Sequence, residues 1–238
     1  MSYQGVKCRL RMTDREKKAG WVLFALVVLV FPYLMGVIQR LIGGIIPIAQ
    51  ANVVYYILIC AALVVIFRFW LQGHFALFFD RLPENMFAVV SGLVILGVLQ
   101  WLAVKIPLPV DNPYYPDMLW QYRVAPGATV LILMVFIPLV EEVFFRGLLF
   151  GTLKRRSRAL AWVVTVSVYC IYCVWQYVFN LGHGPDLRYF LLAVQYLPVA
   201  LATVWCCDRG GSVWASFLLH MLGHGMGLFL LVSGAFVP

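Results

Sequence analysis

The stretch that decides the fold is PLVEEVFFRG, residues 138–147, which stands in the middle of the apolar run 126–153. About 20 apolar residues are enough to cross the hydrocarbon core of a bilayer as a helix. Glu141, Glu142 and Arg146 therefore lie mid-span, where each ionisable group costs roughly 2.5–3.5 kcal/mol on insertion scales. Because a chain rarely keeps such groups without a use, we expect the functional site here.

The composition of the whole chain places this helix in a membrane protein. Of its 238 residues, 63% are hydrophobic and 12% are charged, and the mean hydropathy is +0.91. Soluble domains are about 45–50% apolar and about 25% charged. The values exclude a soluble enzyme, a disordered chain and a disulfide-stapled secreted domain. The apolar stretches are continuous rather than alternating, which disfavours an outer-membrane barrel.

The fold class predicted from these stretches is all-α, a polytopic transmembrane helix bundle. One further stretch, Gln72 to Leu82, is amphipathic, too short to span, and expected at the membrane interface. The seven predicted spanning helices are Trp21 to Ile38, Asn52 to Trp70, Met86 to Lys105, Pro126 to Leu153, Ala159 to Asn180, Leu187 to Cys207, and Val213 to Val232.

The distribution of basic residues predicts the orientation. With the N-terminus in the cytoplasm, thirteen of the 18 lysines and arginines fall on the cytoplasmic side and four on the far side. The net charge of +8 is therefore interpreted as a topology signal, not as a nucleic-acid surface. The longest far-side loop, Ile106 to Ala125, is rich in proline and aromatic residues and suits an interfacial lid. The short loops between the predicted helices favour a location in a bacterial inner membrane.

We expect two parts in the chain. Residues 1–125 would form an N-terminal membrane region with a basic cytoplasmic leader, three helices and an extracytoplasmic loop. Residues 126–238 would form a catalytic core of four helices.

The spacing of the charges in the fourth helix gives them different roles. Glu142 and Arg146 are four residues apart, share a helical face and can pair. Glu141 points about 100° away and has no partner on its own helix. Such a carboxylate is suited to taking a proton from water. The alternative is a buried ion-pair network that only fixes helix packing.

Two histidines mark the seventh helix. His220 and His224 are four residues apart and project from one face. Small residues permit two helices to approach each other closely. Such residues are Gly223 and Gly227 on the seventh helix and Gly147 and Gly151 on the fourth. We therefore expect the fourth and seventh helices to pack together, with Glu141 facing the histidines. A hydrogen-bonded histidine pair without chemistry is the alternative.

These motifs together resemble the CPBP (Abi) family of intramembrane glutamic proteases, which includes the Ras-converting CAAX endopeptidases. The resemblance rests on Glu141-Glu142-x-x-x-Arg146, an aromatic-x-x-x-His pattern, and His220-x-x-x-His224, and it covers roughly residues 126–232. It implies that Glu141 activates water, with Glu142 and Arg146 as supporting partners. It also implies that His220 stabilises the oxyanion together with an asparagine, whose position is occupied here by His224.

The middle motif of the family supplies a histidine, and two positions compete for it. Gln176 stands where the order of the motifs expects the histidine, whereas His183 in Phe179-x-x-x-His183 fits the pattern but falls later. At 1.5 Å rise per residue, Gln176 and His224 lie at the depth of Glu141 to within about two turns, and His183 lies beyond the core unless its loop folds back. We therefore hypothesise that His224 polarises the water and that Gln176 supplies the amide donor.

The predicted function is an intramembrane endopeptidase that acts on a peptide or membrane-anchored protein in the lipid bilayer, with no cofactor and no nucleic acid. A zinc protease is an alternative, since His220 and His224 have ligand spacing and Glu141 could be a third ligand. A proton-coupled transporter is another, because carboxylates and histidines inside a membrane can relay protons. Gln176 and His224 differ from the residues of the family motifs, so an inactive scaffold or immunity protein is a further alternative.

Overall fold

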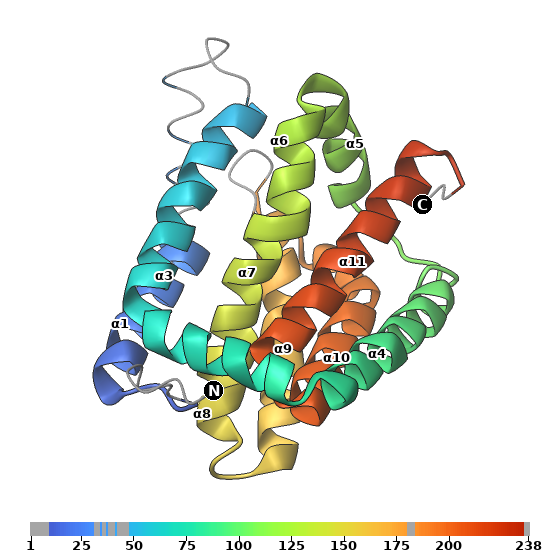
Figure 1. Cartoon of the computed structure of the whole chain (residues 1–238). Coiled ribbons are helices and arrows are strands. Elements are labelled where there is room, and N and C mark those ends of the chain that lie inside the picture. The colour runs from blue at the N-terminus through green and yellow to red at the C-terminus, as the bar shows by residue number, and fades with distance from the viewer. Residues whose placement is uncertain are drawn as a thin grey trace.

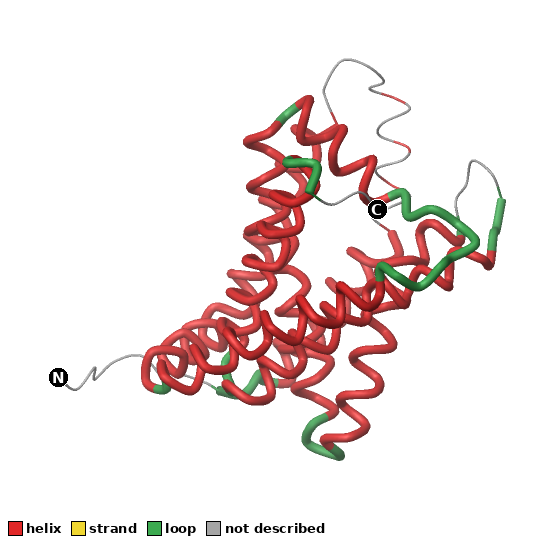
Figure 2. The backbone as a smooth tube through the Cα atoms, turned by 90° about the vertical axis from the view of Figure 1, so that its right-hand side faces the viewer, coloured by secondary structure: helices red, strands yellow, loops and turns green. Residues whose placement is uncertain are grey.

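The computed structural model of the chain describes residues 10–30, 34, 37, 41, 48–179 and 184–235. Within these residues the regular secondary structure is entirely helical (Figures 1 and 2). The N-terminal elements are α1 (Asp14–Ala25), η1 (Leu26–Val30), α3 (Ile48–Asp80), α4 (Leu82–Ala103) and α5 (Tyr114–Val124). The later elements are α6 (Pro126–Leu131), η2 (Ile132–Phe136), α7 (Ile137–Glu141), η3 (Glu142–Phe150), α8 (Gly151–Leu153), α9 (Arg158–Val178), η4 (Leu187–Leu192), α10 (Ala193–Gly210) and α11 (Val213–Val232).

Six helices within the described residues are long and apolar enough to cross a membrane. They coincide with six of the seven predicted segments, and the spans 126–153 and 213–232 have the predicted bounds. The predicted first segment, Trp21 to Ile38, begins in α1 and η1, but most of its residues beyond Val30 lie outside the described part. The all-α polytopic bundle is confirmed.

The stretch expected at the interface, Gln72 to Leu82, is not separated from the preceding span. It forms the end of α3, a helix of 33 residues, because Gly73 alone does not break a helix whose other residues favour it. At 1.5 Å per residue α3 is about 50 Å long, which exceeds the roughly 30 Å of a hydrocarbon core. In Figure 1 the last turns of α3 bend and cross the lower half of the view toward α4.

The predicted far-side loop contains a helix that the sequence analysis did not identify. Within residues 106–125, α5 forms from Tyr114 to Val124. Pro113 precedes it as the N-cap, and Pro116 lies in its first turn, where a proline needs no hydrogen-bond donor. α5 contacts α11 and α3, so it belongs to the body of the bundle.

The helical rod from α6 to α8 carries the charged motif and is unusually wound. Two parts of it are π-helical, η2 and the nine-residue η3, which begins at Glu142. Pro138 follows η2, and a proline cannot donate to the carbonyl four residues earlier, which favours a local change of winding. π-helical turns inside α-helices frequently occur at functional sites.

α10 is the helix around which the C-terminal half packs, since it contacts α4, α9 and α11. The main core unites side chains from both predicted parts of the chain, among them Leu63, Phe67, Phe144 and Leu148. Asp208 of α10 pairs with Lys154 at 2.7 Å and with Arg158 at 2.6 Å. These pairs join the loop between α8 and α9 to α10.

The glycines predicted to join the fourth and seventh helices face other neighbours. A Cβ at Gly147 would lie 2.5 Å from Trp70 of α3, and a Cβ at Gly223 would lie 2.7 Å from Leu96 of α4. The two helices do pack together, because α11 contacts η3. The packing was predicted correctly, but the surfaces assigned to these glycines were wrong.

The turn between α3 and α4 is closed by a buried asparagine. The side-chain nitrogen of Asn85 donates to the carbonyls of Phe78 at 3.1 Å and Arg81 at 2.9 Å, which satisfies acceptors at the end of α3. Gly210 ends α10 directly beside it, and a Cβ there would lie 2.5 Å from Asn85 Oδ1. The close approach of α10 to α4 therefore requires glycine.

We predict that Gly210→Ala destabilises the protein by about 1–3 kcal/mol, because the added methyl group overpacks this junction. Gly97→Ala is the matched control, since a Cβ at Gly97 in α4 meets nothing within 4 Å of the described atoms. Thermal unfolding in detergent should give a lower midpoint for Gly210→Ala alone. Equal midpoints for both variants would show that the α4–α10 junction tolerates a side chain.

Candidate functional site

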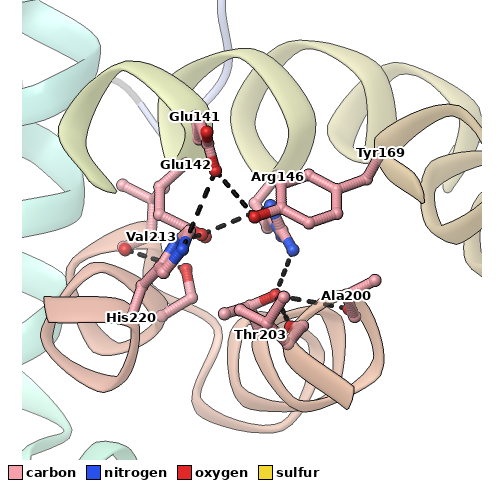
Figure 3. Close-up of polar contacts among 10 residues, drawn as sticks. Glu141, Glu142, Arg146, Tyr169, Ala200, Thr203, Val213 and His220 are labelled. Atoms are coloured by element: carbon pink, nitrogen blue, oxygen red, sulfur yellow. Dashed lines mark hydrogen bonds and ion pairs between the residues drawn. The ribbon is translucent and has the colours of Figure 1, made fainter. Parts of the chain in front are cut away.

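A buried ion pair lies at the centre of the bundle. Arg146 Nη1 stands 3.3 Å from Glu142 Oε1, and the two side chains are 0% and 1% exposed. Nδ1 of His220 lies 2.8 Å from the same Glu142 oxygen. An ionised carboxylate only accepts, so Nδ1 of His220 is the donor. This contact ties η3 to α11, as the sequence predicted for these helices (Figure 3).

α10 and α9 complete the surroundings of the guanidinium. Arg146 Nη2 donates to the Thr203 hydroxyl, which in turn donates to the Val199 carbonyl at 2.5 Å. On another side, the guanidinium carbon lies 4.6 Å from the centre of the Tyr169 ring, within the range of a cation–π interaction. Arg146 therefore connects α10 and α9 to η3 and offsets the buried charge of Glu142.

Glu141 has different neighbours from Glu142. The hydroxyl of Tyr169 donates to Glu141 Oε2 at 2.7 Å, and both residues are buried. Nε2 of His220 lies 3.7 Å from the same oxygen. Figure 3 shows the Glu141 carboxylate between the Tyr169 and His220 side chains. This carboxylate thus has one neutral donor and one imidazole, and its Arg146 neighbour pairs with Glu142 instead.

His224 continues the site toward α5. Its ring stacks on that of His220, with centroids 4.7 Å apart and 17° between the planes. Its Nδ1 lies 3.4 Å from the hydroxyl of Tyr114, at the start of α5. The Nε2 atoms of both histidines are buried without a hydrogen-bond partner among the described residues. They are available to a water molecule or a substrate carbonyl.

These groups line one large cavity of about 1210 Å³. Its wall includes Glu141, Tyr169, His220, His224 and Gln176, together with side chains of α3, α4 and α5. A cavity of this size accommodates several side chains of a peptide as well as water. The arrangement can therefore bring a peptide carbonyl to a carboxylate and two imidazoles.

The structure places the predicted site residues unequally. Glu141, Glu142, Arg146 and His220 form one network, and His224 is stacked beside it. Gln176 lines the cavity at the outer part of α9 and is largely exposed. His183 lies outside the described residues.

Three contacting residues were missed by the sequence analysis. Tyr169, Thr203 and Tyr114 come from α9, α10 and α5. The family motif predicts a histidine on the fifth helix, whereas the side chain that reaches Glu141 is a tyrosine nearly two turns before Gln176. Thr203 and Tyr114 carry no motif, and only the packing of the helices reveals them.

The zinc alternative requires a third ligand beside the two histidines. Across the described ranges, no group of three or more His, Cys, Asp or Glu side chains could hold a metal ion. The two imidazole rings lie parallel to each other rather than converging on one point. Helical spacing alone therefore does not produce a ligand set here.

We predict that Thr203→Val destabilises the protein by about 1–3 kcal/mol, because it leaves Arg146 Nη2 buried without its acceptor. Thr165→Val is the matched control, since Thr165 is also 0% exposed and its hydroxyl has no partner in the described part of the chain. Thermal unfolding should show a loss only for Thr203→Val. A similar loss for both would mean that the hydroxyl bonded to Arg146 contributes nothing specific.

The comparisons with known proteins agree with the motifs. Residues 123–226 match the family model described as type II CAAX prenyl endopeptidase, Rce1-like. Comparison with curated proteins and with solved structures gives no match. The matched region contains the whole Glu142–Arg146–His220 network and excludes Tyr114 of α5. The match supports the resemblance drawn from the motifs, and this region of the chain is similar to the Rce1-like members of the CPBP family of membrane proteases.

Proposed function

We propose that the protein is an intramembrane endopeptidase of the glutamic type, in which Glu141 activates water. The observation that carries the proposal is the place of the Glu141 carboxylate. It lines the large cavity, with the Tyr169 hydroxyl at 2.7 Å and Nε2 of His220 at 3.7 Å from the same oxygen. A carboxylate and an imidazole around one open space form an acid–base site.

In the proposed reaction, Glu141 takes a proton from a water molecule in the cavity. The water oxygen attacks the peptide carbonyl carbon and forms a tetrahedral intermediate with a negatively charged oxygen. When the carbonyl reforms and the C–N bond breaks, Glu141 returns the proton to the leaving nitrogen. The products are a carboxylic acid and an amine, and no oxidant or further reactant is needed.

The two histidines would stabilise the charges that develop in this reaction. His220 is fixed by the donation of its Nδ1 to Glu142, so its Nε2 is held beside Glu141. Stacked on it, His224 presents a second unpartnered Nε2 in the described structure. Donors preorganised in this way stabilise an oxyanion more strongly than solvent does. This geometry favours His220 as the imidazole at the water and His224 as the additional donor.

The sequence led to the hypothesis that His224 polarises the water and Gln176 supplies the amide donor. The distances from the imidazole nitrogens to Glu141 support this hypothesis less well. His220, not His224, has the imidazole nitrogen near Glu141 Oε2. Gln176 instead lies on the outer wall of the cavity, where an amide suits a contact with the substrate backbone.

The orientation proposed for the protein follows from its basic residues. We place the N-terminus in the cytoplasm, in a bacterial inner membrane, so that α5 lies on the far side and Lys154 and Arg158 lie on the cytoplasmic side. The substrate would then be a peptide or a membrane-anchored protein that enters from the bilayer or the far side. Residues 126–238 would act as the catalytic core.

We predict that Glu141→Gln lowers peptide cleavage at least about 100-fold, because the amide cannot accept the proton from water. Glu84→Gln is the matched control, since Glu84 is half-exposed, lies at the start of α4 and is absent from the cavity wall. The measurement is mass spectrometry of new peptide termini, after a proteome-derived peptide library is incubated with the purified, reconstituted protein. Unchanged cleavage by folded Glu141→Gln would refute the glutamic mechanism.

Tyr169→Phe tests whether the orientation of the Glu141 carboxylate matters. The variant keeps the ring beside Arg146 but removes the hydrogen bond to Glu141. We expect kcat to fall at least about 10-fold and KM to change little, because a hydrogen bond to a charged group contributes about 1.5–3 kcal/mol. A rise in KM at constant kcat would instead assign Tyr169 to substrate binding.

A further inference from the structure

The cavity has a charge that differs from that of the chain as a whole. The protein carries a net charge of +8, yet no lysine or arginine occurs among the described residues that line the cavity. The acidic side chains of the lining are Glu141 and Asp117. Charged groups of one sign in a cleft with low-dielectric walls focus an electrostatic field on what enters it. The field in this cavity favours a cation.

At the α5 end, the cavity is bordered by a cluster of tyrosines around one carboxylate. Tyr114 and Tyr196 meet edge to face, with ring centroids 6.5 Å apart. The hydroxyl of Tyr177 hydrogen-bonds with that of Tyr196, and the Asp117 carboxylate lies close enough to act on Tyr177 electrostatically. All four side chains line the cavity. Aromatic faces combined with a carboxylate are the groups that proteins use to bind ammonium and guanidinium ions.

Asp117 has no counterion of its own in the described structure. It belongs to none of the ion pairs that the described residues form, in contrast to Asp186, Asp208 and Asp14. Partial burial raises the pKa of Asp117, and no basic neighbour acts against this effect. The α5 helix places Asp117 one turn after Tyr114, whose hydroxyl contacts His224. The carboxylate is therefore open to an added cation near the reaction site.

One other aromatic group of the cavity wall already has a cation. The ammonium of Lys105 lies 3.6 Å from the centre of the Trp101 ring, on α4. This pair shows that an aromatic side chain of this wall can hold a lysine. The cluster of Tyr114, Tyr177, Tyr196 and Asp117 has no such cation from the described chain.

We propose that the cluster of Asp117, Tyr114, Tyr177 and Tyr196 binds a lysine or arginine side chain of the substrate. This assignment rests on the proposed endopeptidase function and names the substrate class, an apolar peptide segment with a basic residue. Tyr114 connects the cluster to His224, so the basic residue would lie close in sequence to the cleaved bond. Asp117 is then a specificity residue supplied by α5, outside the region that matches the family.

Binding to the full-length Glu141→Gln variant tests the proposal without cleavage. The protein is reconstituted in phosphatidylglycerol vesicles. The probes are three short apolar peptides that differ at one position, which is lysine, glutamine or glutamate. We expect the lysine peptide to bind about 10-fold more tightly than the glutamine peptide, since a carboxylate and cation–π contacts act together. Equal affinity for all three peptides overturns the proposal.

Variants at Asp117, made in the same Glu141→Gln background, assign the effect to this cluster. Asp117→Asn should remove most of the preference for lysine, and Asp117→Lys should reverse it in favour of the glutamate peptide. Asp111→Asn is the matched control, because Asp111 is exposed, precedes α5 and is absent from the cavity wall. A lysine preference that survives folded Asp117→Asn and Asp117→Lys, as verified by thermal unfolding, places the cation elsewhere and overturns the assignment.

Repeating the measurement in phosphatidylcholine vesicles separates the peptide from a lipid headgroup. If the lysine preference persists there, the site takes the peptide side chain. If the preference is lost there, either the anionic bilayer held the lysine peptide or choline occupies the cluster, and in both cases the substrate assignment is wrong. Cleavage of the peptide library without a basic preference would refute this inference alone. If the protein binds the lysine peptide more tightly than the other two but the unsubstituted protein cleaves no peptide, only the endopeptidase function is refuted.

Discussion

The ion pair between Glu142 and Arg146 is the interaction on which the rest of the site depends. Two opposite charges inside a membrane span are acceptable only if each is nearly saturated with partners. The structure supplies partners from three other helices, His220 on α11, Thr203 on α10 and the Tyr169 ring on α9. Glu142 Oε2 and Arg146 Nε are buried without a hydrogen-bond partner among the described residues. The requirement to neutralise one pair of charges thereby brings together the helices that surround Glu141.

Much of this arrangement could be predicted from the sequence, because membrane spans are long and charges within them are rare. The bounds of the last helix and of the charged helix followed from apolar length, and the pairing of Glu142 with Arg146 followed from helical spacing. The meeting of η3 with α11 was predictable from the charges and histidines, although the glycines thought to mediate it face α3 and α4.

The remaining parts of the site could not be predicted, because they depend on how helices pack rather than on what each one contains. Tyr169 is one of several tyrosines on α9, and only its orientation toward Glu141 distinguishes it. The helix α5 was not predicted, because its prolines and polar residues are typical of a loop. Depth along straight helices places Gln176 at the level of Glu141, but it does not show which face of the helix each side chain occupies, so it could not identify Tyr169.

The position of α5 has a consequence for how this protein can change. The groups that would break the bond lie in residues 123–226, on spans joined by the buried charge network. All but the last two residues of α5 precede that region, and α5 lies outside the six apolar spans of the described residues while its side chains line the cavity. Substitutions there can alter what the cavity accepts without disturbing the buried charges. On this proposal, selectivity and chemistry are encoded in separable parts of one chain, and substitutions within the eleven residues of α5 would be enough to change the substrate.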